Sequence, residues 1–321
     1  DEHRLGSGEA LLPGTGYLEL VRAALAELGA AGPWHLHNLV FEAPMFVDDA
    51  GQRALRVVLR GDSKHWNVEI HASSGDGFQR CAVARVDVGV PPAPAVVALD
   101  EVQARCTGPA TAAAGSGALR TRQEHHLRFG PRWQVLRRLQ LGSREALARL
   151  QLAPQFAADL DTHGLHPGLL DIATGCAMDL IPGYAEQEVA QNLWAPISYR
   201  GLRFHAPLQG EIVSWLRLAS SGDAGSDFAA FDVTLTDPQG RVLAEVEQLT
   251  LRRLDGPWHA PREAAAAPQG AEGGDGAGPR AKALSPGEAA LAHNVSQGIA
   301  PAEGLAALAR LLAGELPAEA I

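Results

Sequence analysis

The chain has 321 residues, 46% of them hydrophobic, and a formal net charge of −10 at pH 7. This length predicts about two domain-sized units, and the negative charge argues against a nucleic-acid partner, which would require a basic surface. No apolar run reaches the roughly 18 residues of a membrane-spanning helix, so we expect no membrane segment.

The cysteine content argues against both a disulfide framework and a zinc site. The three cysteines, Cys81, Cys106 and Cys176, are odd in number and lack CxxC spacing, which is typical of a protein in a reducing cytoplasm. The scattered histidines also lack the spacing of a closed zinc site. The first residues are charged, unlike a signal peptide. Because the chain starts and stops within sequence patterns, we expect it to be a segment of a longer polypeptide.

The N-terminal part of the chain predicts one helix followed by four strands. The helix covers residues 13–28, since Pro13 favours its first turn and Gly29 its end. Turns rich in Gly, Asp and Ser bound the strands. We predict these strands over residues 36–47, 54–60, 65–73 and 78–88. One helix with an antiparallel sheet is a complete unit, which we assign to residues 1–92.

A segment rich in Pro, Ala, Gly and Thr follows, and we predict an inter-domain linker at residues 93–118. The pattern of helix and strands then recurs in a second unit over residues 119–255. Its helix is predicted over residues 167–181. Its strands are predicted over residues 133–141, 146–152, 193–204, 211–219, 228–236 and 242–254. Two such units in tandem give an α+β fold.

The last part of the chain, residues 256–321, differs in composition. Residues 264–279 contain almost no large apolar side chain, so they cannot bury enough surface to offset the entropy of ordering. We predict a disordered linker there, followed by short helices that begin near Ser285 and Pro301.

Two motifs far apart in the sequence contain the residue types of an acid–base site. In the first, His3 precedes Gly8 and a helix start at Pro13 and Gly14. Glycines let the backbone approach a ligand closely, and the amides of a helix start can donate to an anionic oxygen. The alternative for His3 is a surface histidine near a chain end.

The second motif is His166-Pro-Gly-Leu-Leu-Asp171. It places Asp171 one turn inside an apolar helix, where a buried carboxylate needs a partner or a proton. The alternative is an aspartate that only favours the positive end of the helix dipole. His166 fits an N-cap position and is predicted to be structural.

These motifs resemble those of the dehydratase domains of modular polyketide synthases. That family has the patterns HxxxGxxxxP, YGPxF and HPxLLDxxxQ/H, and residues 129–133 read Phe-Gly-Pro-Arg-Trp. The resemblance covers roughly residues 1–255 and implies a double hot-dog fold, with His3 as the general base and Asp171 as the catalytic acid. It implies substrate-binding or oxyanion positions at Gly8, Pro13, Gly14, Phe129, Trp133 and Gly175.

The chain departs from the family pattern at four places. The spacing from His3 to the motif glycine, Gly8, is one residue longer, Phe129 replaces the usual tyrosine, and Trp133 replaces the usual phenylalanine. Gly175 stands where the family has Gln or His, four residues after Asp171. Because glycine offers no hydrogen bond, we expect Thr174 or a water molecule to orient the carboxyl group. The missing side chain also predicts a larger pocket.

The resemblance implies elimination of water from a β-hydroxyacyl thioester, giving an α,β-unsaturated thioester. A neutral imidazole removes the α-proton, and a carboxyl group with a raised pKa protonates the leaving hydroxyl. This chemistry needs no metal or redox cofactor. One alternative is a dehydratase-cyclase that closes a cyclic ether by conjugate addition. A second is a non-catalytic docking domain. A variant that only shifts double bonds is less favoured. Family members of that type typically lack the motif proline or aspartate, whereas Pro13 and Asp171 are both present here.

The implied partners are an acyl carrier protein with its phosphopantetheine arm, neighbouring synthase domains and a second copy of the chain. Trp194 and Tyr199 are candidates for an acyl tunnel or for the core. Four arginines are candidates for phosphate or carrier contacts, although isolated arginines on strands usually face solvent. They are Arg137, Arg138, Arg200 and Arg203.

Overall fold

The computed structural model describes residues 2–30, 32–47, 49, 51–75, 77–89, 96–115, 117–184, 192–221 and 226–255. All of them fall within one compact unit, Asp1–Arg262. The linker and helices predicted over residues 256–321 lie outside the described residues. Within the described part of the chain, no helix is long and apolar enough to cross a membrane. Cys81, Cys106 and Cys176 are buried and free.

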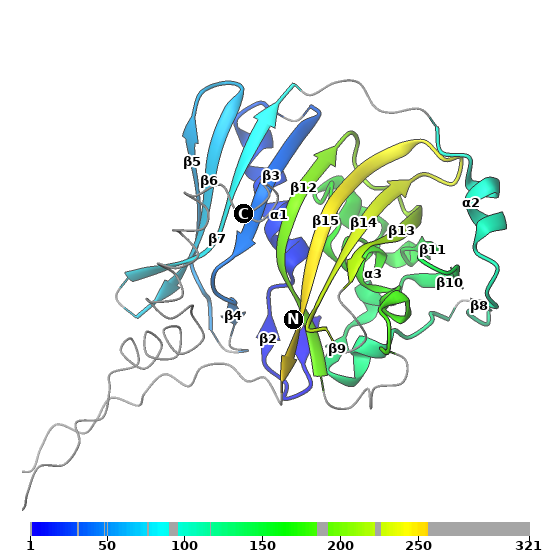
Figure 1. The fold of residues 1–321 in the computed structure, drawn as a ribbon. Helices are drawn as coiled ribbons and strands as arrows, with labels where there is room; N and C mark the ends of the chain where they lie inside the picture. Colours follow the sequence, from blue (N-terminus) through cyan, green and yellow to red (C-terminus); the bar gives the residue numbers. More distant parts are fainter. Residues whose placement is uncertain are drawn as a thin grey trace, which may run out of the picture. The chain divides into compact units, whose positions relative to one another are not determined.

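Eleven antiparallel strands form one large sheet, in the order β5-β6-β7-β3-β12-β15-β14-β13-β11-β10-β8 (Figure 1). The two predicted units meet where β3 pairs with β12, so they share this sheet. The first unit contributes β3 (Trp34–Phe41), β5 (Leu55–Gly61), β6 (His65–Ser74) and β7 (Gly77–Val88). The second contributes β10 (Leu136–Leu141), β11 (Glu145–Gln151), β12 (Asn192–Phe204), β13 (Glu211–Ser221), β14 (Phe228–Thr236) and β15 (Val242–Asp255).

Two helices bury their apolar faces in the core beside this sheet. Helix α1 (Gly14–Glu27) lies within one residue of the prediction at each end. Helix α3 (Pro167–Gly175) is shorter than the predicted 167–181, because it ends at Gly175, a poor helix former, and a 3₁₀ turn, η4 (Met178–Leu180), follows. Fully buried side chains of both helices belong to one core cluster: Leu18, Val21, Leu25, Leu169, Leu170 and Ala173.

Buried polar contacts join the two helices near their N-termini. The Thr15 hydroxyl donates to the Pro167 carbonyl over 3.3 Å. The buried Glu19 carboxylate accepts from the Leu165 amide at 2.7 Å and pairs with Arg22. The start of α1, which follows the first motif, is therefore fixed next to the start of α3, which contains the second.

The predicted linker contains regular structure that the sequence did not predict. Within residues 96–115, α2 (Leu99–Arg105) packs Val102 against Leu147 and Val213, and β8 (Ala110–Ala112) pairs with β10. The predicted strand 133–141 is also too long at its start. Pro131 begins a 3₁₀ turn, η2 (Pro131–Trp133), because proline favours the first position of a helical turn.

A second, smaller sheet has the order β4-β2-β1-β9. Its strands are β1 (His3–Leu5), β2 (Ala10–Leu11), β4 (Phe46–Val47) and β9 (Leu127–Phe129). The predicted strand 36–47 is wrong in its middle, because Pro44 lacks an amide hydrogen for the ladder and the chain splits into β3 and β4. Two further 3₁₀ segments are η1 (Arg122–His125) and η3 (Pro154–Asp161). The pairing of His3 with Phe129 brings residues from both halves together.

Candidate active site

His3 lies on β1 with its side chain only 8% exposed. Its Nδ1 atom is 3.0 Å from the carbonyl oxygen of Leu11. A carbonyl only accepts, so this hydrogen bond requires the hydrogen on Nδ1 and leaves Nε2 without one in the neutral imidazole. The Nε2 atom is therefore the basic nitrogen, and it lies 3.7 Å from Oδ2 of Asp171.

Asp171 occupies the fifth position of α3. Its Oδ2 atom accepts a hydrogen bond from the Trp133 indole nitrogen at 2.8 Å. Burial raises the pKa of this carboxyl group above its ordinary value, and this outweighs the opposing effects of His3 and of the Trp133 hydrogen bond. A raised pKa favours the protonated form, which is the form that can donate a proton.

Two aromatic rings flank His3. The ring centroid of Phe129 is 5.5 Å from that of His3, and the ring of Trp133 is 6.0 Å away. The two aromatic side chains are themselves stacked, with 6.4 Å between centroids. The three rings thus form a cluster in which the imidazole packs against both aromatic side chains, while Trp133 also directs its N–H group to Asp171.

His3 and Asp171 both line a cavity of about 260 Å³. Apolar side chains from both halves form most of its wall, which suits an acyl chain better than a polar ligand. Residues of this wall include Tyr17, Phe41, Met178, Leu193, Trp194 and Tyr199. The two tunnel candidates from the sequence, Trp194 and Tyr199, are thus at the cavity and are also buried in the core cluster.

Four of the six expected binding positions line this cavity: Pro13, Gly14, Phe129 and Gly175. Trp133 is not among the lining residues and acts on the site through Asp171. Gly8 also lies outside the lining, in the turn between β1 and β2, where its φ of 108° favours glycine.

Two glycines of the cavity wall differ in the space around them. A Cβ atom on Gly14 would lie 3.0 Å from the Pro196 ring and 3.1 Å from that of Phe41. The start of α1 therefore approaches the opposite wall as closely as a residue without a side chain allows. A Cβ atom on Gly175 would meet nothing within 4 Å, so the expected room beside Asp171 is present.

The expectation that Thr174 orients Asp171 is wrong. The Thr174 hydroxyl lies 2.9 Å from the Leu170 carbonyl, to which it donates, and Trp133 supplies the donor to the carboxylate. No sequence pattern predicts the contact between Trp133 and Asp171, since the two residues are 38 positions apart. His166 is the N-cap of α3 as predicted, and its side chain accepts from the Leu169 amide.

The sequence also missed Thr121 and Gln123, which line the cavity from the region of η1. Gln123 donates to the Tyr184 hydroxyl at 2.8 Å. None of the four candidate arginines lines the cavity; Arg200, for example, pairs with Glu247. Across the described residues, no cluster of His, Cys, Asp and Glu is arranged to hold a metal ion.

Comparisons with known proteins agree on one family. A family model described as polyketide synthase dehydratase N-terminal domain matches residues 94–257, and one described as polyketide synthase dehydratase domain matches residues 1–73. The chain is 31% identical over 285 residues to the polyketide synthase GfsE of Streptomyces halstedii, which covers 83% of the chain and 7% of the relative. It is 28% identical to the polyketide synthase ThaG of Burkholderia thailandensis, covering 74% and 4%. The chain thus spans less than a tenth of the length of these relatives.

Solved structures show a similar fold. The dehydratase domain of RzxB from Pseudomonas fluorescens superimposes with a TM-score of 0.64 at 24% identity, over 78% of this chain and 88% of that one. The dehydratase domain from the CurJ module of the curacin polyketide synthase gives a TM-score of 0.66 at 18% identity, over 79% and 87%.

Proposed function

The chain belongs to the polyketide synthase dehydratase family and has its double hot-dog fold, and on this premise we propose that it is a hydro-lyase. It removes water from a β-hydroxyacyl thioester and yields an α,β-unsaturated thioester. The observation that carries this proposal is the approach of His3 Nε2 to Asp171 Oδ2, at 3.7 Å, on the wall of an apolar cavity.

In this mechanism His3 is the general base. Its Nδ1–H group is held by the Leu11 carbonyl, so the free electron pair of Nε2 takes the α-proton of the thioester. The electron pair of the broken C–H bond forms the new double bond. The first amides of α1 have no acceptor within the helix, and Pro13 supplies no side-chain cap. They are suited to stabilise negative charge on the thioester oxygen.

Asp171 is the general acid. Its raised pKa keeps a proton available, and this proton passes to the β-hydroxyl as the carbon–oxygen bond breaks. Water leaves, His3 holds the α-proton, and Asp171 is a carboxylate. Transfer of the proton from Nε2 to Oδ2, which are 3.7 Å apart, restores the starting pair.

The substrate arrives on the phosphopantetheine arm of an acyl carrier protein, and the elimination needs no metal or redox cofactor. The short spans that the chain covers in its relatives support a role within a larger synthase, beside other domains. The apolar cavity wall supports an acyl chain as the cargo. A second copy of the chain is the expected partner in a homodimer.

The test uses a β-hydroxyhexanoyl chain on a phosphopantetheinylated acyl carrier protein, supplied as both enantiomers. Mass spectrometry should detect the loss of one water, together with the ultraviolet absorbance of an enoyl thioester. The Asp171→Asn variant is the matched control. A folded wild-type chain that leaves this substrate and its longer homologues unchanged would favour a non-catalytic docking role.

The open space at Gly175 favours a second candidate, a dehydratase that also closes an oxygen ring. This room, beside the acid and within the cavity, would let a hydroxyl further along the chain reach the β-carbon of the enoyl thioester. A carrier-bound substrate with a second hydroxyl at ring-forming distance tests the idea. Cyclisation gives the mass of the enoate without its absorbance. If only the open enoate accumulates, and Gly175→Gln changes nothing, the chain is a simple dehydratase.

A further inference from the structure

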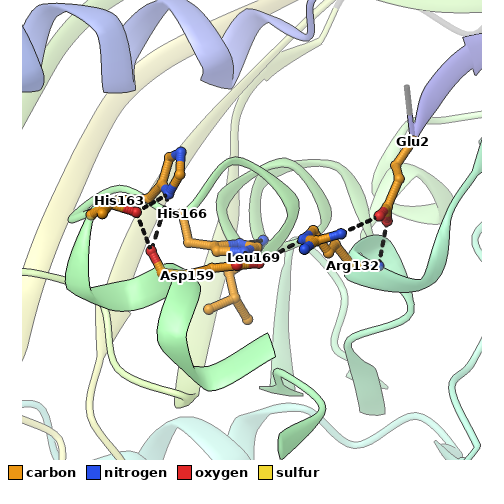
Figure 2. A network of polar contacts seen from close by, with 7 residues as sticks. Glu2, Arg132, Asp159, His163, His166 and Leu169 are labelled. Atoms are coloured by element: carbon orange, nitrogen blue, oxygen red, sulfur yellow. Dashed lines mark hydrogen bonds and ion pairs between the residues drawn. The ribbon is translucent and has the colours of Figure 1, made fainter. Parts of the chain in front are cut away.

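We propose that Arg132 is a positioning residue for the acid–base pair, a role that rests on the proposed function. Arg132 precedes Trp133 on η2, and its side chain bridges two carboxylates from distant parts of the chain. One carboxylate belongs to the segment before His3, and the other to the segment before α3. Figure 2 shows this chain of contacts, which runs from Glu2 through Arg132 and Asp159 to His166.

The first arm of the network fixes the residue before the base. Glu2 Oε1 lies 2.5 Å from Nη1 of Arg132, and Oε2 accepts from the Arg132 backbone amide at 2.7 Å. The Glu2 carbonyl also accepts from the Gly130 amide at 2.7 Å. Three hydrogen bonds therefore hold Glu2, and with it the start of β1, on the turn that carries Trp133.

The second arm fixes the start of the helix that carries the acid. The Arg132 Nε–H donates to Asp159 Oδ2 at 2.6 Å, and the same oxygen lies 3.6 Å from His166 Nε2. The Nδ1 atom of His166 accepts from the Leu169 amide at 3.2 Å, so Nε2 carries the hydrogen and faces the carboxylate. Asp159 thus connects Arg132 with the N-cap of α3.

The backbone of Arg132 also packs tightly against α3. A Cβ atom on Gly168 would lie 2.5 Å from the Arg132 carbonyl oxygen, so no side chain fits between the turn and the helix. On the same turn, the Trp133 indole reaches Asp171 at 2.8 Å. A shift of Arg132 therefore moves the donor to the acid and the strand of the base together.

A purely structural role of Arg132 would predict that its loss lowers folding stability rather than turnover. The Arg132 side chain is 40% exposed, and exposed ion pairs contribute little to folding stability. Catalytic geometry is far more sensitive, because a displacement of about 1 Å can cost roughly a hundredfold in rate. We therefore expect Arg132 variants to fold normally and to turn over slowly.

The kinetic test compares Arg132→Met with Arg105→Met, using the carrier-bound β-hydroxyhexanoyl substrate. Arg105 is about as exposed as Arg132, and it forms a bidentate ion pair with a single carboxylate, that of Glu145, away from the cavity. In Arg132→Met we expect kcat to fall at least about tenfold and KM to stay within about threefold of the wild-type value. The reason is that Arg132 positions the reacting groups and does not bind the substrate. Arg132→Lys should recover part of the rate, since lysine keeps the positive charge but lacks the planar guanidinium with its several N–H donors. Arg105→Met should match the wild type.

A second measurement does not depend on activity. The indole N–H resonance of Trp133, assigned in a ¹⁵N spectrum by its loss in Trp133→Phe, reports the hydrogen bond to Asp171. It should shift upfield in Arg132→Met and stay in place in Arg105→Met. If Arg132→Met does not fold, Asp159→Leu removes the acceptor of the second arm with little change in size, and the same two results are expected.

The outcomes separate the two proposals. A folded Arg132→Met protein with wild-type kcat and an unchanged indole resonance would overturn the positioning role. A wild-type chain that does not dehydrate the substrate contradicts the proposed function alone. In that case the indole resonance decides the positioning role by itself, since a shift in Arg132→Met but not in Arg105→Met supports it.

Discussion

The two halves of the molecule hold their reactive side chains in different ways. His3 is fixed by main-chain groups: β1 pairs with β9, and the Leu11 carbonyl accepts from the imidazole. Asp171 is fixed by side chains, since its hydrogen bond comes from the Trp133 indole, whose turn is anchored by Arg132. A main-chain carbonyl survives any substitution, and an amide survives any except proline. The contacts of the imidazole should therefore tolerate a change of the Leu11 or Phe129 side chain, whereas the hydrogen bond of the acid should not tolerate loss of the Trp133 side chain.

The largest effect is expected from removing either reactive group. His3→Ala and Asp171→Asn should each lower the rate of water loss by about a thousandfold or more, since general acid–base groups contribute on this scale. Both variants should remain folded by circular dichroism, because neither side chain belongs to the hydrophobic core cluster. Turnover close to that of the wild type in either variant would refute the assignment of the pair.

The next effect tests the difference between the two halves directly. Trp133→Phe removes the donor to Asp171. We expect kcat to fall about tenfold, because one hydrogen bond to the carboxylate that forms as Asp171 gives up its proton is lost. Leu11→Ala is the matched change beside His3. It keeps the carbonyl acceptor, so kcat should stay within about threefold of the wild type. Equal losses in both variants would contradict the contrast between main-chain and side-chain support.

The pH dependence of Trp133→Phe has a defined sign. The indole hydrogen bond lowers the pKa of Asp171, so its loss raises that pKa. The acid acts in its protonated form, so activity falls as pH rises through this pKa. The alkaline limb of the kcat/KM profile should therefore move to higher pH. His3 and Tyr199 also interact electrostatically with Asp171, and both remain in the variant. A limb that stays in place or moves to lower pH would contradict this assignment.

A smaller effect is expected at the start of α1. In Gly14→Ala the new methyl group would lie 3.0 Å from the Pro196 ring, so the cavity wall must move outward by a few tenths of an ångström. We expect KM to rise about threefold while kcat changes less, since the displaced wall weakens substrate binding more than it disturbs the reacting groups. Glu27→Ala, a change at an exposed position of the same helix outside the cavity lining, is the control for altered helix stability.

The smallest effect is a gain in stability at Gly175. Its backbone does not have a positive φ, and a Cβ atom there meets open space. Gly175→Ala should therefore raise stability by about 0.5 kcal/mol through helix propensity and chain entropy, or Tm by roughly 1–2 °C. Gly8→Ala should lower Tm, because the φ of Gly8 is 108°. A fall in Tm for Gly175→Ala would show that the helix end is more constrained than its contacts indicate.

The sequence predicted long periodic elements well and short ones poorly. Helix α1 and strands such as β6 repeat apolar residues over enough turns or alternations to be recognised. Strands β1 and β9 have three residues each, too few for any periodicity. Each strand is stabilised by its pairing with the other, and a local sequence pattern cannot predict that pairing.

The candidate active site, like the short strands, could be predicted only in part from local sequence patterns. The motifs around His3 and Asp171 predicted which residues to examine, and the approach of these two groups follows from the fold. The Trp133–Asp171 bond joins residues 38 positions apart, and the Arg132–Glu2 pair joins residues 130 positions apart. Neither spacing corresponds to a turn of a helix or a rung of one strand. These contacts depend on the tertiary path of η2, where the sequence predicted binding positions at Phe129 and Trp133 and the start of a strand.

The pairing of β1 with β9 has a consequence for the order of folding during synthesis. His3 leaves the ribosome well before its partner Phe129, which lies 126 positions further along the chain. At about 5–20 residues per second, the gap is roughly ten seconds. Helix α1 and the hairpins of β5, β6 and β7 involve contacts much closer in sequence, which form faster than distant ones. Limited proteolysis of arrested nascent chains should find the peptide near His3 cleavable until residues 127–129 have emerged. The general base can thus reach its working position only after residues about 126 positions further along the chain have been made.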